Sequence, residues 1–267
     1  MFTQILHWSG ARVLDVLADA GRLWQVSYSA TKRVIYVPLR GGKLRVNATI
    51  EQIVLAGNNS LALVALISIL IGMILALQSA YQLQKFGVAN LVADLVAVSL
   101  TRELAPLITA ILVAGRVGSA ITAELGTMKI SQEIDALTVM GIDPVTMVVV
   151  PRLLGLVVAV PALTIFSALL GILGGSVVAV SVLGLSMTGY LNDSLAALVQ
   201  QDIWGGVLKA LVFGFIIGIV SCQQGLDTEG GADEVGRSTT RAVVRSIVLI
   251  IAADLFVTSF LYLRGLA

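Results

Sequence analysis

The sequence is poor in charge, cysteine and histidine, and each shortage excludes a class of protein. Only 12% of the 267 residues are charged, against roughly 25% in soluble domains, which excludes an ordinary water-soluble globule. Cys222 is the only cysteine and His7 the only histidine, so an intrachain disulfide and a cysteine–histidine metal centre are excluded. The 17 Lys and Arg residues nearly balance the 16 Asp and Glu residues, so no basic excess indicates a nucleic acid partner.

The common motifs of catalysis are also missing. The sequence contains neither a G-x-S-x-G turn nor an H-E-x-x-H helix. The stretch most similar to a phosphate-binding loop, Gly41-Gly42-Lys43, lacks the upstream glycine and the following Ser or Thr of a P-loop. We therefore predict that the chain is not an enzyme and binds no metal or cofactor, and that any ATP and magnesium are bound by a separate ATPase chain.

What the sequence does contain is long apolar runs, with 57% hydrophobic residues. A helix needs roughly 20 mainly apolar residues to cross about 30 Å of hydrocarbon. We predict an all-α integral membrane protein with an N-terminal cytoplasmic or interfacial segment at 1–53 and a transmembrane domain at 54–267. The five expected spans are Leu61–Leu77, Leu91–Ala114, 147–182, Ile203–Cys222 and Val243–Leu263.

The uncharged run from Leu153 to Asn192 leaves an alternative open. As one helix it would be about 60 Å long at 1.5 Å per residue, twice the hydrocarbon thickness. We interpret it as one span followed by an exposed turn at Gly184–Asp202. Two short helices would instead reverse the orientation of everything that follows.

Positive charge favours the five-span interpretation. Seven Lys and Arg residues precede the first span, and the four connections contain one, three, none and three. This alternation is what the positive-inside rule predicts for a cytoplasmic N-terminus and a periplasmic C-terminus. Within the spans, Gly171-x-x-x-Gly175 and Gly214-x-x-x-Gly218 predict close helix packing.

The N-terminal segment has the pattern of an amphipathic helix. Apolar residues recur at spacings of seven and four, and the charged residues fall on another face. The apolar positions are Leu6, Val13, Leu17, Trp24 and Tyr28. This pattern predicts a helix on the cytoplasmic membrane surface, and a helix packed on a soluble partner would look similar.

Four ionisable residues fall inside the expected spans: Arg102, Glu103, Lys209 and Asp254. Each costs about 2.5–3.5 kcal/mol at the centre of a membrane helix, and such residues mark functional sites by default. The alternative is an interhelical ion pair that only fixes packing. Lys209 could instead extend its charge to the membrane surface, and Thr258 or the Arg241 and Arg245 side could satisfy Asp254.

The connection after the second span contains a short helix with clear ends. Ser131 is its expected N-cap, Glu133 lies in the first turn, and Gly141 is followed by Pro144 at the C-terminal end. Its apolar face consists of Ile134, Leu137 and Met140. Such a helix can dock into a groove on a partner or fold back on its own bundle.

Several segments together resemble the MlaE family, the permease subunits of ABC-type lipid transporters that work with MCE-domain proteins. The segments are Leu100–Pro106, Ala114–Ala120, Ala123–Met128, Glu133–Leu137, Met140–Pro144 and Gly230–Val244. The resemblance implies a homodimer bound to two cytoplasmic ABC ATPase chains and a periplasmic MCE-domain hexamer. Whether a small STAS-type regulatory subunit also binds does not follow from the sequence. It implies phospholipid as substrate and the inner membrane of a diderm bacterium as location.

The resemblance also assigns roles to residues. It places Arg102, Glu103 and Lys209 at the polar part of the lipid pocket. It makes the helix at 131–141 a coupling helix on the ATPase, with Glu133 and Asp135 flanking its apolar face. Toward the outer end of the first span, we expect further pocket residues at Leu75, Leu77, Gln78 and Tyr81.

Two other functions account for only part of the sequence. A proton-coupled secondary transporter could use Glu103 or Asp254, but five spans do not divide into two equal inverted halves. A non-transporting membrane scaffold would not explain charged residues within the spans together with a capped helix outside them.

Overall fold

The computed structural model describes residues 21–34, 36, 45–88 and 91–264. Over these ranges the chain is helical and contains no strand. Five helices are long and apolar enough to cross a membrane: Val46–Lys85, Val92–Ile130, Val145–Ser181, Gln200–Leu226 and Ala232–Leu263. The predicted all-α fold with five spans is therefore confirmed.

The spans differ in how continuous they are. The first is α2 (Val46–Lys85), the fourth α9 (Gln200–Leu226) and the fifth α10 (Ala232–Leu263). The second contains two π-helical turns, in the order α3 (Val92–Ser99), η2 (Leu100–Leu104), α4 (Ala105–Val113), η3 (Ala114–Gly118) and α5 (Ser119–Ile130). The third consists of a π-helical turn, η4 (Val145–Val149), and α7 (Val150–Ser181).

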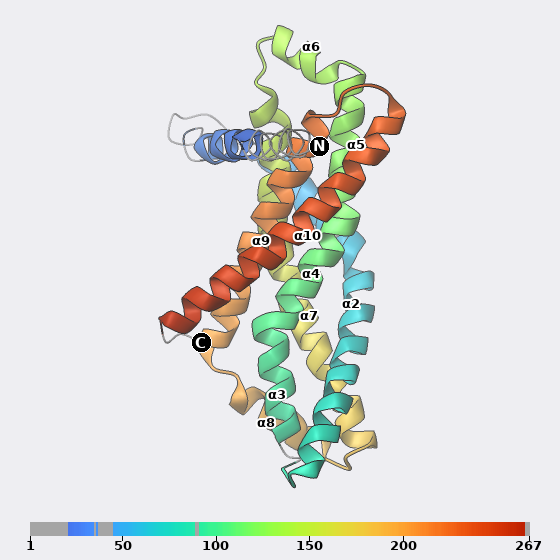
Figure 1. The fold of residues 1–267 in the computed structure, drawn as a ribbon, viewed down its shortest axis with the longest axis vertical. Coiled ribbons are helices and arrows are strands. Elements are labelled where there is room, and N and C mark those ends of the chain that lie inside the picture. Colours follow the sequence, from blue (N-terminus) through green and yellow to red (C-terminus); the bar gives the residue numbers. More distant parts are fainter. Residues whose placement is uncertain (1–20, 35, 37–44, 89–90, 265–267) are drawn as a thin grey trace, which may run out of the picture.

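Two short helices occupy opposite ends of the bundle (Figure 1). One end carries α6 (Glu133–Val139), and the other carries α8 (Met187–Ala197). A further helix at 21–34 lies across the spans toward the α6 end, and α10 runs obliquely, with its C-terminal part leaning away from the other helices (Figure 1).

Several expected boundaries are wrong, although the number of spans is right. The second span continues to Ile130 rather than ending at Ala114. The expected turn at Gly184–Asp202 contains α8, whose N-cap Ser186 accepts a hydrogen bond from the Gly189 N–H at 3.0 Å.

The uncharged run contains one span, because α7 passes through Pro161 without a break and ends at Ser181. The division between residues 53 and 54 stays a prediction, and α2 is continuous across it.

The N-terminal amphipathic helix is only partly described. Leu6, Val13 and Leu17 lie outside the described residues. Trp24 and Tyr28 lie on the helix at 21–34 and are 72% and 59% exposed. Their exposure is compatible with a membrane surface, and the interfacial placement stays a prediction.

Small residues bring α2 and α7 into backbone contact along their length. The buried positions of α2 recur every four residues and are Ala56, Ser60, Val64, Ser68, Gly72, Ala76 and Ala80. Opposite them, Gly171 and Gly174 of α7 lie against the backbone of α2, and the hydroxyls of Ser68 and Ser167 are 2.7 Å apart. Of the two predicted glycine pairs, Gly171 and Gly175 approach the backbone of α2, and Gly214 and Gly218 of α9 pack against α7.

We expect Gly174→Leu to break this packing. A Cβ at Gly174 would lie 2.3 Å from the carbonyl oxygen of Ile69, so the two helices must separate, and overpacking of this kind costs about 1–3 kcal/mol or more. Thermal unfolding of the purified protein in detergent should show the loss. Gly57→Leu is the control, because a Cβ at Gly57 meets nothing within 4 Å, and equal unfolding temperatures for the two variants would contradict this packing.

Candidate functional site

The four charged residues predicted within the spans come together in one cluster. Lys209 of α9 forms ion pairs with Glu103 of η2 and with Asp254 of α10, the latter at 3.1 Å. The Lys209 side chain is only 2% exposed, so it does not extend to the membrane surface. Asp254 is therefore paired with Lys209 rather than with Arg241 or Arg245, and Thr258 donates a hydrogen bond to Glu103 at 3.3 Å.

Arg102 pairs with a fifth charged residue, Asp202, which the sequence pattern did not single out. Their side chains approach to 3.3 Å, and the Asp202 side chain is 4% exposed. Asp202 also accepts a hydrogen bond from the Val199 N–H at 3.1 Å, which caps the first turn of α9. We expected Asp202 in an exposed turn. Its pairing with Arg102 could have been anticipated only if α9 had been predicted to begin at Gln200, before Asp202.

The π-helical turn η2 explains why neighbouring residues reach different partners. The Ala105 N–H donates to the Leu100 carbonyl, five residues back. Pro106 follows and has no N–H to donate to the carbonyl of Arg102, so a regular α-helical bond is absent there. The wider turn directs Glu103 toward α9 and α10, while Arg102 reaches the start of α9.

The cluster opens into a pocket of about 270 Å3. Its lining is Arg102, Glu103, Gln201, Gly205, Lys209, Thr258 and Leu261. Around the pocket, two cations meet three carboxylates in a region of apolar helices. This mixture suits a ligand whose charged group is held by fixed ion pairs while the rest of it contacts apolar surface.

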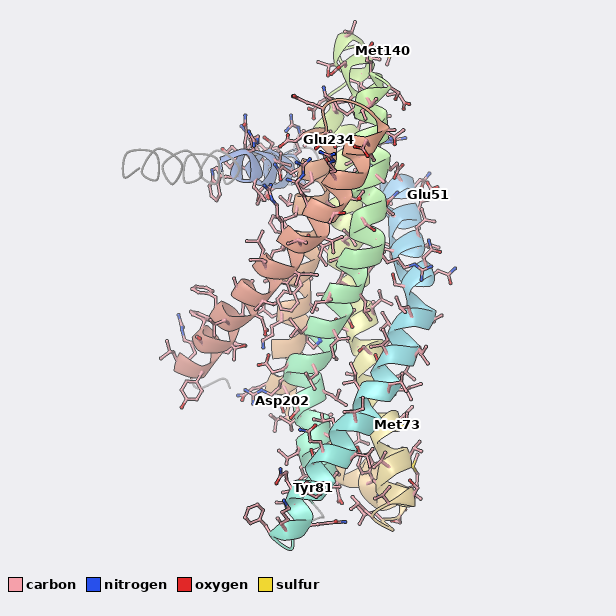
Figure 2. The ribbon with its side chains drawn as sticks, turned by 45° about the vertical axis from the view of Figure 1, so that its right-hand side comes forward. Glu51, Met73, Tyr81, Met140, Asp202 and Glu234 are labelled. Atoms are coloured by element: carbon pink, nitrogen blue, oxygen red, sulfur yellow. The ribbon has the colours of Figure 1, made fainter. Side chains whose placement is uncertain are left out.

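The other residues expected in the pocket lie elsewhere in the chain that the structure describes. Leu75 packs among apolar side chains that include Tyr190. Leu77 is 47% exposed, and Tyr81 is 63% exposed with the Lys85 ammonium 4.1 Å from its ring centre. Figure 2 shows Tyr81 near the end of α2, away from Asp202. These residues and Gln78 do not line the pocket at Arg102, and their role stays a prediction.

The helix expected at 131–141 is shorter than predicted and has a different N-terminal residue. Its N-cap is Gln132, in the left-handed conformation with φ 62°, rather than Ser131. The Ser131 hydroxyl instead donates to Glu133 at 2.9 Å. The C-terminal glycine is confirmed, because Gly141 has φ 75° and the Ile142 N–H bonds the Leu137 carbonyl at 2.9 Å.

The apolar face of α6 is divided between the bundle and the surface. Ile134 is buried against the bundle at 7% exposure, Leu137 is partly buried, and Met140 is 64% exposed. Leu137 and Met140 line a groove of about 780 Å3 together with Glu133, Ala136 and residues of α5, η4 and α7. Figure 2 shows Met140 at the extreme end of the molecule. The helix therefore folds back on its own bundle in part, and docking of its exposed residues on a partner stays a prediction.

Ion pairs hold the surroundings of α6 in place. Asp135 pairs with Lys129 at 2.8 Å, and Arg152 of α7 pairs with Glu124 of α5 at 2.6 Å. Arg33 of the helix at 21–34 bonds Asp143 at 2.7 Å. Partial burial by itself would raise the pKa of Asp143, but hydrogen bonds from Thr146 and the charge of Arg33 outweigh it, so this pKa is lowered.

Metal coordination has no candidate in the described ranges. There, no group of three or more His, Cys, Asp and Glu side chains is placed to hold a metal ion. The acidic residues near Lys209 and Arg102 form ion pairs with those two cations.

Comparison with known proteins connects this geometry to a family. The family described as Permease MlaE matches residues 49–260. A probable ABC transporter permease protein of Rickettsia prowazekii is 35% identical over 262 residues, which are 98% of this chain and 99% of the relative.

Two further relatives come from a cyanobacterium and a plant. A probable ABC transporter permease protein of Synechocystis is 37% identical and covers 86% of this chain and 88% of its own. The chloroplastic protein TRIGALACTOSYLDIACYLGLYCEROL 1 of Arabidopsis thaliana is 38% identical over 83% of this chain and 63% of its own. This chain, with its five spans and its charged cluster within them, therefore belongs to the MlaE permease family.

Proposed function

We propose that this chain is the permease subunit of an ATP-driven phospholipid transporter, moving lipid between the inner membrane of a bacterium and a periplasmic MCE-domain partner. The observation that carries the proposal is the ionic cluster of Arg102, Glu103, Lys209, Asp202 and Asp254 within the spans. Pairing offsets only part of the free-energy cost of placing these charges in the membrane. Binding of a polar lipid headgroup during transport would explain why the charges are present.

An apolar pocket beside the cluster fits the other half of a lipid. It measures about 480 Å3 and lies against Thr101 and Gly206, the chain neighbours of Arg102 and Gly205. Its remaining lining is almost entirely aliphatic and comes from α7, α9 and the segment before α9. A charged cluster and an apolar pocket on adjacent residues match the two ends of an amphipathic substrate. The name of the Arabidopsis relative is that of a glycerolipid.

The proposal includes a homodimer. The most apolar part of α10 is only 11% buried within one chain, less than any other span. Val248, Ile251, Leu255 and Phe256 are all more than half exposed on it. Because Asp254 lies on the same helix, an interface along α10 would bring the charged clusters of two subunits near one axis.

ATP would be hydrolysed by a partner chain. ABC transporter permeases, as the relatives are named, act with an ATPase. We assign its docking to α6 and the groove lined by Leu137 and Met140. A proton-coupled transporter remains the alternative, in which Glu103 or Asp254 would carry the proton.

The proposed orientation puts α6 and the N-terminus in the cytoplasm and α8 and the C-terminus in the periplasm. With Cys222 replaced by alanine, we expect Asn192→Cys to react with a membrane-impermeant maleimide in intact cells. Glu229→Cys should react only after the cells are opened. Both positions are exposed in the structure. The reverse pattern would contradict the proposed orientation.

The function itself is tested with the assembled complex. Mass spectrometry of lipids retained after purification should detect phospholipid, and reconstituted complex should transfer labelled phospholipid only when ATP is hydrolysed. Transfer that proceeds without ATP but follows a proton gradient would favour the secondary transporter. Absence of both retention and transfer in an intact complex would contradict a lipid substrate.

A further inference from the structure

A polar pocket of about 420 Å3 is lined by segments that lie toward the α6 end of the bundle (Figure 1). It is formed by the last turns of α9, the first half of α10 and the helix at 21–34. Its lining is Arg22, Gln224, Asp227, Ser238, Arg241 and Arg245. It is separate from the cluster at Lys209, because Lys209 and Gln224 are 15 residues apart on α9, or about 22 Å at 1.5 Å per residue.

The lining is rich in guanidinium groups. It contains three guanidinium groups and one carboxylate. Asp227 lies 3.2 Å from Arg22 and also accepts a hydrogen bond from Gln223 at 2.6 Å. Arg241 pairs with Glu234, which lies outside the lining, and donates to the Ser238 hydroxyl at 3.1 Å. These contacts orient Arg22 and Arg241, and the lining itself contains more guanidinium groups than carboxylates.

The pocket also has hydrogen-bonding groups in its lining. Ser238 is 1% exposed and Gln224 is 6% exposed, so a buried hydroxyl and a buried side-chain amide line the pocket together with the guanidinium groups. Guanidinium forks bind the oxygens of a phosphate in pairs. A hydroxyl and an amide suit further oxygens of the same group. The chemistry of the pocket therefore fits a phosphate ester.

The surroundings indicate where such a phosphate would come from. The helix at 21–34, which supplies Arg22, also exposes Trp24 and Tyr28 at 72% and 59%. Amphipathic aromatic side chains favour the level of lipid headgroups. Arg245 lies where α10 enters its apolar stretch, so the pocket lies at the boundary of the spans rather than out in solution.

We propose that this pocket binds the phosphate of a phospholipid headgroup from the leaflet at the α6 end, which is the cytoplasmic leaflet in the proposed orientation. The bound lipid joins the helix at 21–34 to α9 and α10, whose link within the described chain includes the Arg22–Asp227 ion pair. The proposed orientation decides only which leaflet the lipid comes from. Its ligand chemistry does not depend on transport.

The test uses the purified full-length protein in an uncharged detergent. The probes are short-chain phosphatidylglycerol and inorganic phosphate, and the readout is the unfolding temperature. We expect saturable stabilisation by the lipid. The double variant Arg241→Gln/Arg245→Gln should need at least about tenfold more lipid for half-saturation, since charge-assisted hydrogen bonds to phosphate are lost. Arg237→Gln is the matched control, because Arg237 is 70% exposed on the same helix and does not line the pocket.

Four results would overturn the site. The double variant could bind the lipid as well as Arg237→Gln does, or inorganic phosphate could stabilise the protein at the same concentrations as the lipid, which would make this a free-phosphate site. Arg241→Lys/Arg245→Lys, which keeps the charge and removes the forks, could match wild type. Finally, Arg102→Gln could lose the lipid effect while the double variant keeps it. That would place the bound lipid at the Lys209 cluster and leave the proposed function standing.

Discussion

Lys209→Met is expected to abolish lipid transport and to destabilise the protein markedly. The methionine keeps most of the side-chain volume but removes the charge that pairs with Glu103 and Asp254. The two carboxylates would then share one region without a cation. Breaking a buried ion pair from one side costs about 3–5 kcal/mol, and Lys209 is the most buried member of the cluster, with 2% exposure.

A combined variant separates the structural role from the functional one. In Lys209→Met/Glu103→Gln/Asp254→Asn, neutral amides replace both carboxylates, so no charge is left without a partner among these three residues. The stability of the fold should therefore recover, while lipid transfer stays absent. Thermal unfolding and reconstituted lipid transfer measure the two effects separately. If the triple variant transports lipid like wild type, the three residues are only packing partners and the substrate passes elsewhere.

Glu103→Ala should be milder than Lys209→Met for stability, because it leaves the Lys209–Asp254 pair intact and electrically neutral. It should still impair transport, since it removes the acceptor of Thr258 and a wall of the pocket. Arg102→Ala should lower the amount of phospholipid that co-purifies. Both variants are measured in the same transfer and lipid-retention assays.

Leu137→Asp is expected to abolish stimulation of the partner ATPase. Leu137 lines the groove beside α6, and a carboxylate there would be buried against the ATPase without a partner. Because Leu137 also packs on its own bundle, Met140→Asp is the companion variant. Met140 lines the same groove but is 64% exposed, so its replacement should leave the fold intact and give the same loss of stimulation.

The control for both variants is Thr127→Asp. Thr127 is exposed on α5 and does not line the groove, so it adds the same charge outside α6. ATPase activity and co-purification of the ATPase are measured for all three. Wild-type stimulation in a well-folded Met140→Asp variant would show that the ATPase docks elsewhere on the protein.

The number and order of the spans could be predicted because they follow from a one-dimensional property. A span requires an uninterrupted apolar run of fixed length, and the runs in this chain are separated clearly enough to count. The C-terminal end of α6 was predictable for a similar reason, because Gly141 supplies the left-handed residue that closes the helix. The N-cap was missed because Gln132, in an unusual conformation, begins the helix in place of Ser131.

The charged residues show where prediction stops. Arg102, Glu103, Lys209 and Asp254 stand out in the sequence as costly residues in apolar runs, yet their pairing does not. The π-helical turn η2 before Pro106 sets the directions of Arg102 and Glu103. Asp202 pairs with Arg102 from the first turn of α9, because that helix begins at Gln200, three residues before the start we predicted.

Sequence alone therefore determined that this is an all-helical membrane protein with five spans, charged groups inside them and a short helix outside them. Tertiary structure decided which helices touch and which charges pair. The backbone contact of Gly174 with Ile69 and the ion pairs of Lys209 join residues more than 40 positions apart. Such contacts depend on how the helices rotate and tilt against one another, and an apolar run carries the same hydropathy at every rotation.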